Sequence, residues 1–214
     1  MTEQEWHECS NPRLMVEYLR SRGTDRKLRL LGCACVRSVW SLTGEQVPTV
    51  IETVERFADS SATKAGLRRF QKELREARDR LDGEDARTRL MWGANWLTEV
   101  LATGKAFRSI TAEMERLEGV FVFQNLDWQM IEHFVRDIFG NPFRPVVLDP
   151  RWRTSDVLGL ARAIYEDKAF DRMPILADAL MEAGCADEQI LDHCRGDGPH
   201  VRGCWVVDLV LGKE

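Results

Sequence analysis

Apolar residues recur at three- and four-residue steps over most of the chain, which is the period of an amphipathic helix. The clearest stripe consists of Leu28, Leu31, Cys35, Val39 and Leu42. Stripes of the same period predict helices over residues 10–23, 24–44, 47–58, 64–81, 85–102, 127–139, 154–164, 171–184 and 187–196. The pattern therefore predicts an all-α fold, a multi-helix bundle-like array in two packed lobes.

Helix termini are marked by capping residues. Asn11 and Pro12, Thr154 or Ser155, Asp171 and Asp187 stand where helices are expected to begin, because short polar side chains cap free amides and proline fits the first turn. Two segments stay ambiguous between helix and strand, Gly119–Phe123 (GVFVF) and Cys204–Leu211.

A proline-rich stretch, GNPFRPVVLDPRW, interrupts the helical pattern. Pro142, Pro145 and Pro150 each push the preceding residue out of the helical region, which predicts an extended connector. The expected organisation is an N-terminal helical lobe over residues 1–140, a connector over 141–153 and a C-terminal helical lobe over 154–214.

The N-terminal charges, the length of the apolar runs and the cysteines indicate in which cellular compartment the protein is expected. Acidic Glu3 and Glu5 stand where a secretory signal needs basic residues, and no uncharged apolar stretch reaches the ~18 residues that span a bilayer. We therefore expect a cytoplasmic protein with no membrane association. Its six cysteines are expected to be reduced thiols without a structural disulfide.

A local excess of positive charge lies near the N-terminus, although the chain carries a formal net charge of −5. Such an excess can follow a phosphate backbone, yet no phosphate-binding glycine loop accompanies it. Exposure to solvent or pairing with acidic residues of neighbouring helices is the favoured interpretation, and no nucleic-acid partner is expected. The basic residues are Arg13, Arg20, Arg22, Arg26, Lys27, Arg29 and Arg37.

Reactive side chains are sparse. Cys33 and Cys35 have ligand-pair spacing, but residues two apart on a helix point to different sides, so core packing with Cys35 on the apolar stripe is favoured. No serine nucleophile elbow and no H-E-x-x-H zinc motif occurs, so no catalytic and no cofactor-binding residue is predicted.

The C-terminal stretch LDHCRGDGPHVRGCWVVDLVLGKE carries the candidate chemistry. Four potential zinc ligands lie close together in it: His193, Cys194, His200 and Cys204. If a last helix began at Pro199, then His200, Cys204 and Asp208 would share one stripe. The alternative is a buried element in which Asp208 pairs with an arginine such as Arg195 or Arg202, and this packing interpretation is favoured.

Both ends of the chain resemble an uncharacterised paralogous family that is numerous in planctomycete bacteria. The resemblance covers Met1 to Ala58 and Asp137 to Glu214, through stretches such as MTEQEWHECSNPRLMVEYLR, DRKLRLLGCACVRSVW and IFGNPFRPVVLDPRWRTSDVL. In that family a further cysteine stands where this chain has Val36, and a leucine where it has His7. No activity is established for the family, so the resemblance implies no catalytic residues.

Three classes of function follow from these observations. A non-catalytic helical module that binds a protein partner or a second copy of itself is favoured, because the long charged helices expected over residues 64–102 carry narrow apolar seams. The alternatives are a small zinc-binding protein that uses the C-terminal His/Cys cluster, and an enzyme of unrecognised type at the same place.

Overall fold

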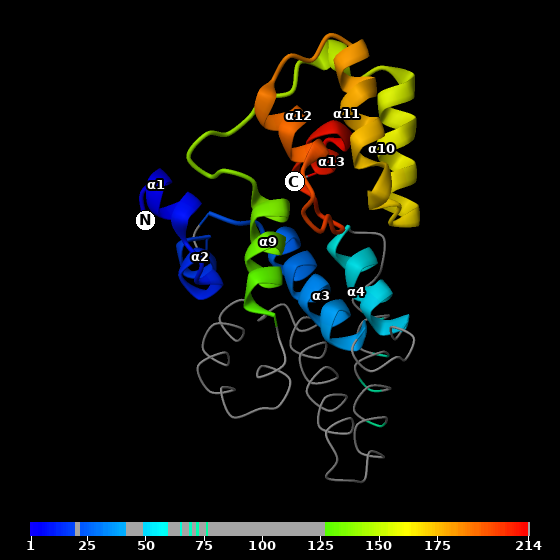
Figure 1. Ribbon diagram of the computed structural model, residues 1–214. Helices are drawn as coiled ribbons and strands as arrows, with labels where there is room; N and C mark the ends of the chain where they lie inside the picture. The colour runs from blue at the N-terminus through cyan, green and yellow to red at the C-terminus, as the bar shows by residue number, and fades with distance from the viewer. Residues whose placement is uncertain are drawn as a thin grey trace. The chain divides into compact units, whose positions relative to one another are not determined.

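The computed structural model describes residues 1–19, 22–41, 49–59 and 127–213, with the isolated positions 65, 69, 72 and 76. The regular elements of these residues are helical, so the predicted all-α fold is confirmed (Figure 1). The α-helices are α1 (Glu3–Glu8), α2 (Pro12–Leu19), α3 (Asp25–Ser41), α4 (Thr49–Ala58), α9 (Trp128–Phe139), α10 (Ser155–Asp167), α11 (Met173–Glu182), α12 (Glu188–Arg195) and α13 (Trp205–Leu211). None of these helices is long and apolar enough to cross a membrane.

Contacts within the chain form two compact units. Unit 1 consists of residues 1–8 and 133–214, and unit 2 of residues 9–132. The connector expected over residues 141–153 thus lies within unit 1, and residues 1–8 and 133–140 group with the C-terminal helices. The predicted division into an N-terminal lobe over residues 1–140 and a C-terminal lobe over residues 154–214 stays a prediction.

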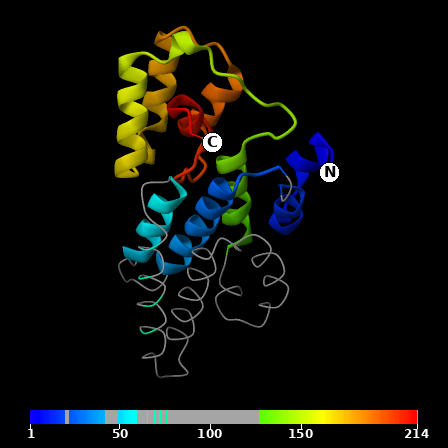
Figure 2. The same ribbon diagram turned by 180° about the vertical axis from the view of Figure 1, so that it is seen from behind.

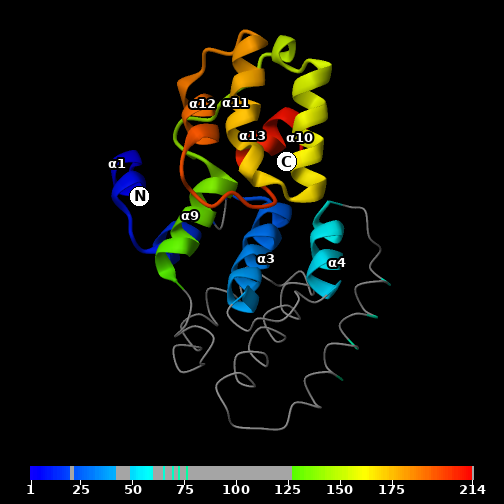
Figure 3. The ribbon, with the colours of Figure 1, turned by 45° about the vertical axis from the view of Figure 1, so that its right-hand side comes forward.

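Unit 1 is built around α13. This helix packs against α10 and α12, and α11 packs against both α10 and α12. Figures 2 and 3 show α13, coloured red, surrounded by α10, α11 and α12. The core of unit 1 contains Val157, Ile164, Leu176, Leu180, Ile190 and Val206 among its fully buried side chains. The C-terminal segment is therefore an internal helix, which settles the ambiguity over Cys204–Leu211; Gly119–Phe123 lies outside the described residues.

The caps that begin the helices of unit 1 agree in part with the sequence. The Thr154 side chain accepts a hydrogen bond from the Val157 amide at 3.3 Å, and Asp187 accepts one from the Ile190 amide at 3.2 Å, as expected for N-caps. The prediction that Asp171 caps the helix now labelled α11 was wrong. Asp171 lies in a short 3-10 turn, Phe170–Arg172, and α11 begins after it at Met173.

Unit 2 pairs its basic residues with acidic ones. Arg26 Nε lies 3.0 Å from Asp59 Oδ1, and Arg37 contacts both carboxylate oxygens of the buried Glu55 at 2.6 and 3.0 Å, which joins α3 to α4. Further arginines stack over aromatic rings (Arg13 over Trp128, Arg22 over Tyr18 and Arg29 over Phe57). The ion pairs of Arg26 and Arg37 confirm the expected pairing with acidic residues of neighbouring helices.

The two cysteines of α3 are packing residues. Cys33 is buried in the core, and burial raises the pKa of the Cys35 thiol to about 12. The buried face of α3 therefore includes Cys33, which was not part of the apolar stripe predicted from the sequence. A thiol with so high a pKa is a poor nucleophile, because the thiolate is the reactive form.

Candidate metal centre

Four side chains of unit 1, which offer oxygen, nitrogen and sulfur as ligand atoms, converge on one point. Asp137 comes from the last turn of α9, His193 from α12, His200 from the loop after α12, and Cys204 from the position directly before α13. Each offers one potential ligand atom, and these atoms all lie within 4.8 Å of one another. Residues that are up to 67 positions apart in the chain (204 − 137) are thereby brought to a common centre.

The shortest contacts of the cluster radiate from Asp137 and His193. Asp137 Oδ1 lies 2.6 Å from His200 Nδ1 and 3.1 Å from His193 Nε2, and the same His193 nitrogen lies 3.2 Å from Cys204 Sγ. Bond lengths of about 2.0–2.1 Å to nitrogen or oxygen and about 2.3 Å to sulfur imply tetrahedron edges of about 3.3–3.6 Å around zinc. The three shortest separations are somewhat below these edges and the largest, at most 4.8 Å, is above them, so small side-chain adjustments would bring the four atoms to zinc-binding distances.

A tight loop carries His200 and Cys204 back to α9. Gly196 ends α12, and Gly203 adopts a φ of +99°, which residues with a side chain rarely adopt. Within the loop the Cys204 amide donates to the Val201 carbonyl oxygen at 2.9 Å, which closes a turn. The Val201 amide donates to Asp137 Oδ2 at 2.8 Å. One oxygen of Asp137 therefore anchors the loop, while the other faces both histidines.

Close packing fixes the end of α9 beside α13. Gly140 follows α9 with a φ of +63°, and a Cβ atom there would lie 3.1–3.3 Å from the indole ring of Trp205. That ring in turn lies against His193, with ring centroids 5.1 Å apart, and the rings of His193 and His200 are 4.9 Å apart. The glycine thus allows Trp205 to approach and support the imidazole of His193.

The cluster is largely withdrawn from solvent. The side chains of Asp137 and His200 are 5% and 8% exposed, and that of His193 is 18% exposed. Cys204 is fully buried. Nε2 of His200 is buried without a hydrogen-bond partner among the described residues. Because a buried polar atom without a partner is costly, this nitrogen is a candidate ligand atom in its own right.

The surroundings shift the pKa values of Asp137 and Cys204 in opposite directions. Burial tends to raise the pKa of Asp137, but hydrogen bonds from His193 and His200 and the electrostatic interaction with both rings lower it by more, so the net direction is downward. The pKa of Cys204 is raised well above its usual value by burial and by the negative charge of Asp137. Without a metal the cluster therefore holds a carboxylate next to a protonated thiol.

A Cys–His–Asp triad is the enzyme arrangement that these residue types could form, and its geometry is not met. In such a triad the two ring nitrogens of the histidine face different partners, the nucleophile and the carboxylate. Here Nε2 of His193 contacts both Cys204 and Asp137. Moreover the raised pKa of Cys204 disfavours the thiolate, which is the reactive form. These contacts suit ligation better than nucleophilic catalysis.

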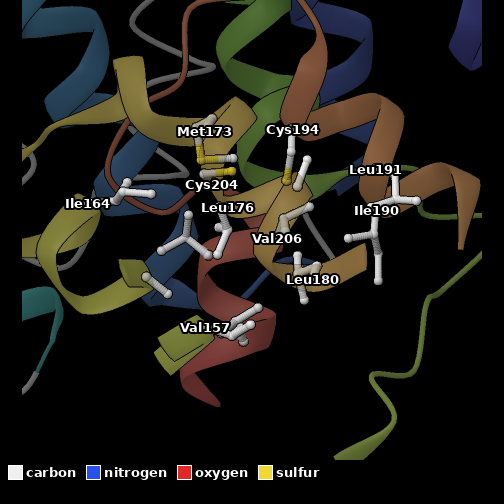
Figure 4. Close-up of a cluster of buried hydrophobic side chains, with 14 of the residues drawn as sticks. Val157, Ile164, Met173, Leu176, Leu180, Ile190, Leu191, Cys194, Cys204 and Val206 are labelled. Atoms are coloured by element: carbon white, nitrogen blue, oxygen red, sulfur yellow. The ribbon is translucent and has the colours of Figure 1, made fainter. Parts of the chain in front are cut away.

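Three of the four ligands named from the sequence belong to the cluster, and the fourth does not. His193, His200 and Cys204 converge, whereas Cys194 is buried in the apolar core that also contains Val206 (Figure 4). Burial raises the pKa of the Cys194 thiol to about 12, with smaller contributions from the charges around it. As neighbours on α12, His193 and Cys194 point to different sides, so one helix cannot direct both at one ion.

A last helix beginning at Pro199, which the sequence left open, does not form, although His200 and Cys204 do converge. The last helix begins at Trp205, so His200 and Cys204 meet through the loop and not through a helical stripe. Asp208 is buried on α13 but is not a member of the cluster. Arg195, one of the two arginines considered as its partner, pairs with Asp178 at 3.0 Å, and Arg202 stacks over the ring of Tyr165. The pairing of Asp208 with an arginine stays a prediction.

Asp137 is the residue that sequence reasoning missed. It stands between Val135 and Ile138 on a helix whose apolar stripe is strong, and in the structure it is 4% exposed. A carboxylate at the edge of an apolar stripe has to find a partner when it is buried, which is the signal that could have drawn attention to it. Its partners come from residues 193–201, too far along the chain for spacing to reveal them.

Searches of the chain against protein-family models, curated proteins and solved structures find no match. The resemblance to the planctomycete family therefore stays an expectation, and the interpretation of the cluster depends on its own geometry.

Proposed function

We propose that unit 1 is a metal-binding domain in which Asp137, His193, His200 and Cys204 hold one Zn²⁺ ion. The observation that supports this proposal is the convergence of a carboxylate, two imidazoles and a thiol whose ligand atoms lie within 4.8 Å of one another. With neutral imidazoles, a carboxylate and a thiolate balance the two positive charges of the ion. Net neutrality matters here because an unbalanced buried charge is costly.

The donor types favour zinc over the abundant hard cations. Mg²⁺ and Ca²⁺ select oxygen ligands, whereas one sulfur and two imidazole nitrogens in a cluster of this size suit Zn²⁺. A bound dication also reverses the protonation of Cys204, because a coordinating thiol loses its proton even where burial alone would keep it.

A structural role fits the site better than a catalytic one. Catalytic zinc keeps a coordination position open to water or substrate, while structural zinc is closed by four protein ligands. This cluster offers four ligands, of which Asp137, His200 and Cys204 are almost fully buried. The ion would join α9, α12, the following loop and the start of α13, and so stabilise the fold of unit 1.

Metal content tests this proposal. We expect elemental analysis of the full chain, purified without a histidine tag, to give about one zinc per chain. Cys204→Ala should abolish stoichiometric zinc, and Cys194→Ala is the matched control because it truncates a second buried thiol outside the cluster. A folded wild-type protein that takes up no zinc when it is supplied, or equal zinc in both variants, would contradict the assignment.

The interaction role expected from the sequence stays a separate prediction. Its basis was the pair of charged helices over residues 64–102, which lie outside the described residues apart from positions 65, 69, 72 and 76. The expected cytoplasmic location and the expected lack of nucleic-acid binding are predictions of the same standing.

A further inference from the structure

The N-terminal helix α1 is held by side chains from the segment that contains the proposed metal ligand Asp137. Arg136, its direct neighbour, donates from Nη2 to the carbonyl oxygens of Trp6 at 3.0 Å and His7 at 3.2 Å. These carbonyls lie at the C-terminal end of α1, where a positive charge is favourable. Trp6 itself is 1% exposed. We call residues 1–8 the N-terminal latch.

The rest of the polar attachment comes from the following residues. Asn141 Nδ2 donates to Glu3 Oε1 at 2.8 Å, and Arg144 Nε lies 2.6 Å from the same oxygen. Together with Arg136, these residues place the support of the latch within residues 136–144, which we call the platform. The hydrogen bond from Asn141 and the contact with Arg144 lower the pKa of Glu3, so the carboxylate is the form that is held.

The latch depends on the platform for its order. A helix of six residues is too short to persist by itself in water. On the surface, an open pocket of about 390 Å³ is lined by side chains from α1, the platform and α12 (Glu3, Gln4, His7, Asn141, Arg144 and Gln189). A change in the position of the platform would therefore reach the latch through the contacts of Arg136, Asn141 and Arg144.

The other side of the platform is tied to the cluster. Asp137 contacts His200, His193 and the Val201 amide, and Gly140 lies against Trp205, the residue after Cys204. The platform is thus the segment that the proposed ligands and the latch share. Energetic coupling between two sites needs such a shared element, whose arrangement both sites bias.

We propose that residues 1–8 form a metal-dependent latch, which the platform holds more tightly when zinc occupies the cluster than when zinc is removed. This inference rests on the proposed metal site and adds a conformational consequence to it. By thermodynamic linkage, the factor by which zinc stabilises the captured latch equals the factor by which the captured latch strengthens zinc binding.

Hydrogen exchange of the full chain, followed by mass spectrometry, measures the latch directly. The amides of residues 1–8, including that of Trp6, which donates to the Thr2 carbonyl oxygen at 3.0 Å, report on α1. We expect exchange there to be about 5- to 150-fold faster after removal of zinc by a chelator, the range of ordinary site-to-site coupling.

The reciprocal experiment breaks the latch and measures the metal. Arg136→Gln removes the charged contacts to the carbonyls of Trp6 and His7, and we expect it to speed exchange in residues 1–8 and to weaken zinc affinity by the same factor by which zinc protects the latch. Arg151→Gln is the matched control. This arginine is 86% exposed and pairs with Asp149 two residues away, so both readouts should keep their wild-type values.

The outcomes separate the latch from the metal site. Stoichiometric zinc with unchanged exchange in residues 1–8 would overturn the latch and leave the proposed function intact. The latch is also overturned if Arg136→Gln frees residues 1–8 without weakening zinc binding. A chain that binds no zinc would overturn both proposals. Zinc-dependent protection of residues 1–8, lost in Arg136→Gln and kept in Arg151→Gln, supports the latch.

Discussion

Truncation of Asp137 to alanine perturbs the cluster at the residue that contacts both histidines and also anchors the loop through the Val201 amide. In the metal-free protein the carboxylate can only accept hydrogen bonds, so Nδ1 of His200, at 2.6 Å, must be the donor of that contact. The Val201 amide donates to the other oxygen at 2.8 Å. Asp137→Ala leaves both donors without an acceptor, in surroundings where the carboxylate itself was 5% exposed.

The size of the effect follows from these contacts. A buried donor that loses its acceptor costs about 1–3 kcal/mol, and Asp137→Ala leaves two such donors, His200 Nδ1 and the Val201 amide. We therefore expect Asp137→Ala to lower the free energy of unfolding of metal-free unit 1 by roughly 4 kcal/mol. Asp137→Asn keeps an oxygen for the Val201 amide and loses the charge, so a smaller loss of about 1–2 kcal/mol is expected.

The same carboxylate gives a pH dependence with a definite sign. Because the pKa of Asp137 is lowered in the folded protein, its contribution to stability is present above the unfolded-state pKa and is lost as the pH falls below about 4 toward the lower folded-state pKa. The two variants lack this carboxylate, so their deficit relative to the wild type should shrink in that acidic range.

Hydrogen exchange of the α13 amides in chelator-treated protein reads the stability of unit 1 without interference from unit 2. The reasoning predicts a large deficit for Asp137→Ala and a smaller one for Asp137→Asn at about pH 7, both shrinking in acid. If both variants lie within about 0.5 kcal/mol of the wild type, the contacts of Asp137 do not support the fold, and the argument is refuted.

Three further predictions concern other parts of the chain. Gly140→Ala should lower the stability of unit 1 by about 1–2 kcal/mol, because a φ of +63° and the nearby indole of Trp205 both oppose a side chain there. Gly159→Ala is the control and should be neutral or stabilising, because Gly159 lies in α10 with open space around it. Thermal unfolding that ranks the two variants in the opposite order would contradict this. Zinc binding should release about one proton from Cys204 near neutral pH, measured as the buffer dependence of the binding enthalpy, and a release unchanged in Cys204→Ala would refute it. Arg37→Met should cost roughly 3 kcal/mol in urea unfolding because it removes both hydrogen bonds that Arg37 donates to the buried Glu55 carboxylate. Combining it with Glu55→Gln should recover part of that loss, and a neutral single variant would be the contrary result.

Helices could be predicted from the sequence because their signals are local. The stripe through Val157, Ala161 and Ile164 and the caps at Thr154 and Asp187 depend on neighbours within a few residues. Short α1 was not predicted, since its six residues carry one buried side chain, Trp6, and its order depends on contacts about 130 residues away. Residues 1–8 group with the C-terminal helices through such distant contacts, which the spacing of residues in the sequence cannot reveal.

The candidate site shows the same division. His193, His200 and Cys204 could be named because they are reactive types close together in the sequence. Cys194 was added for the same reason, yet helix geometry turns it into the core. Asp137 could not be found by proximity, because its place in the cluster depends on the tertiary packing of α9 against the C-terminal loop.

X-ray absorption at the zinc edge tests the central claim most directly, because it reports the atoms bound to the metal. For the zinc-loaded full chain the account predicts one sulfur at about 2.3 Å and three nitrogen or oxygen atoms at about 2.0–2.1 Å. The sulfur should be absent from any zinc retained by Cys204→Ala and present in Cys194→Ala. Zinc in the wild-type chain surrounded by nitrogen and oxygen alone, or a sulfur contribution that survives Cys204→Ala, would contradict the assignment of the cluster as the metal site.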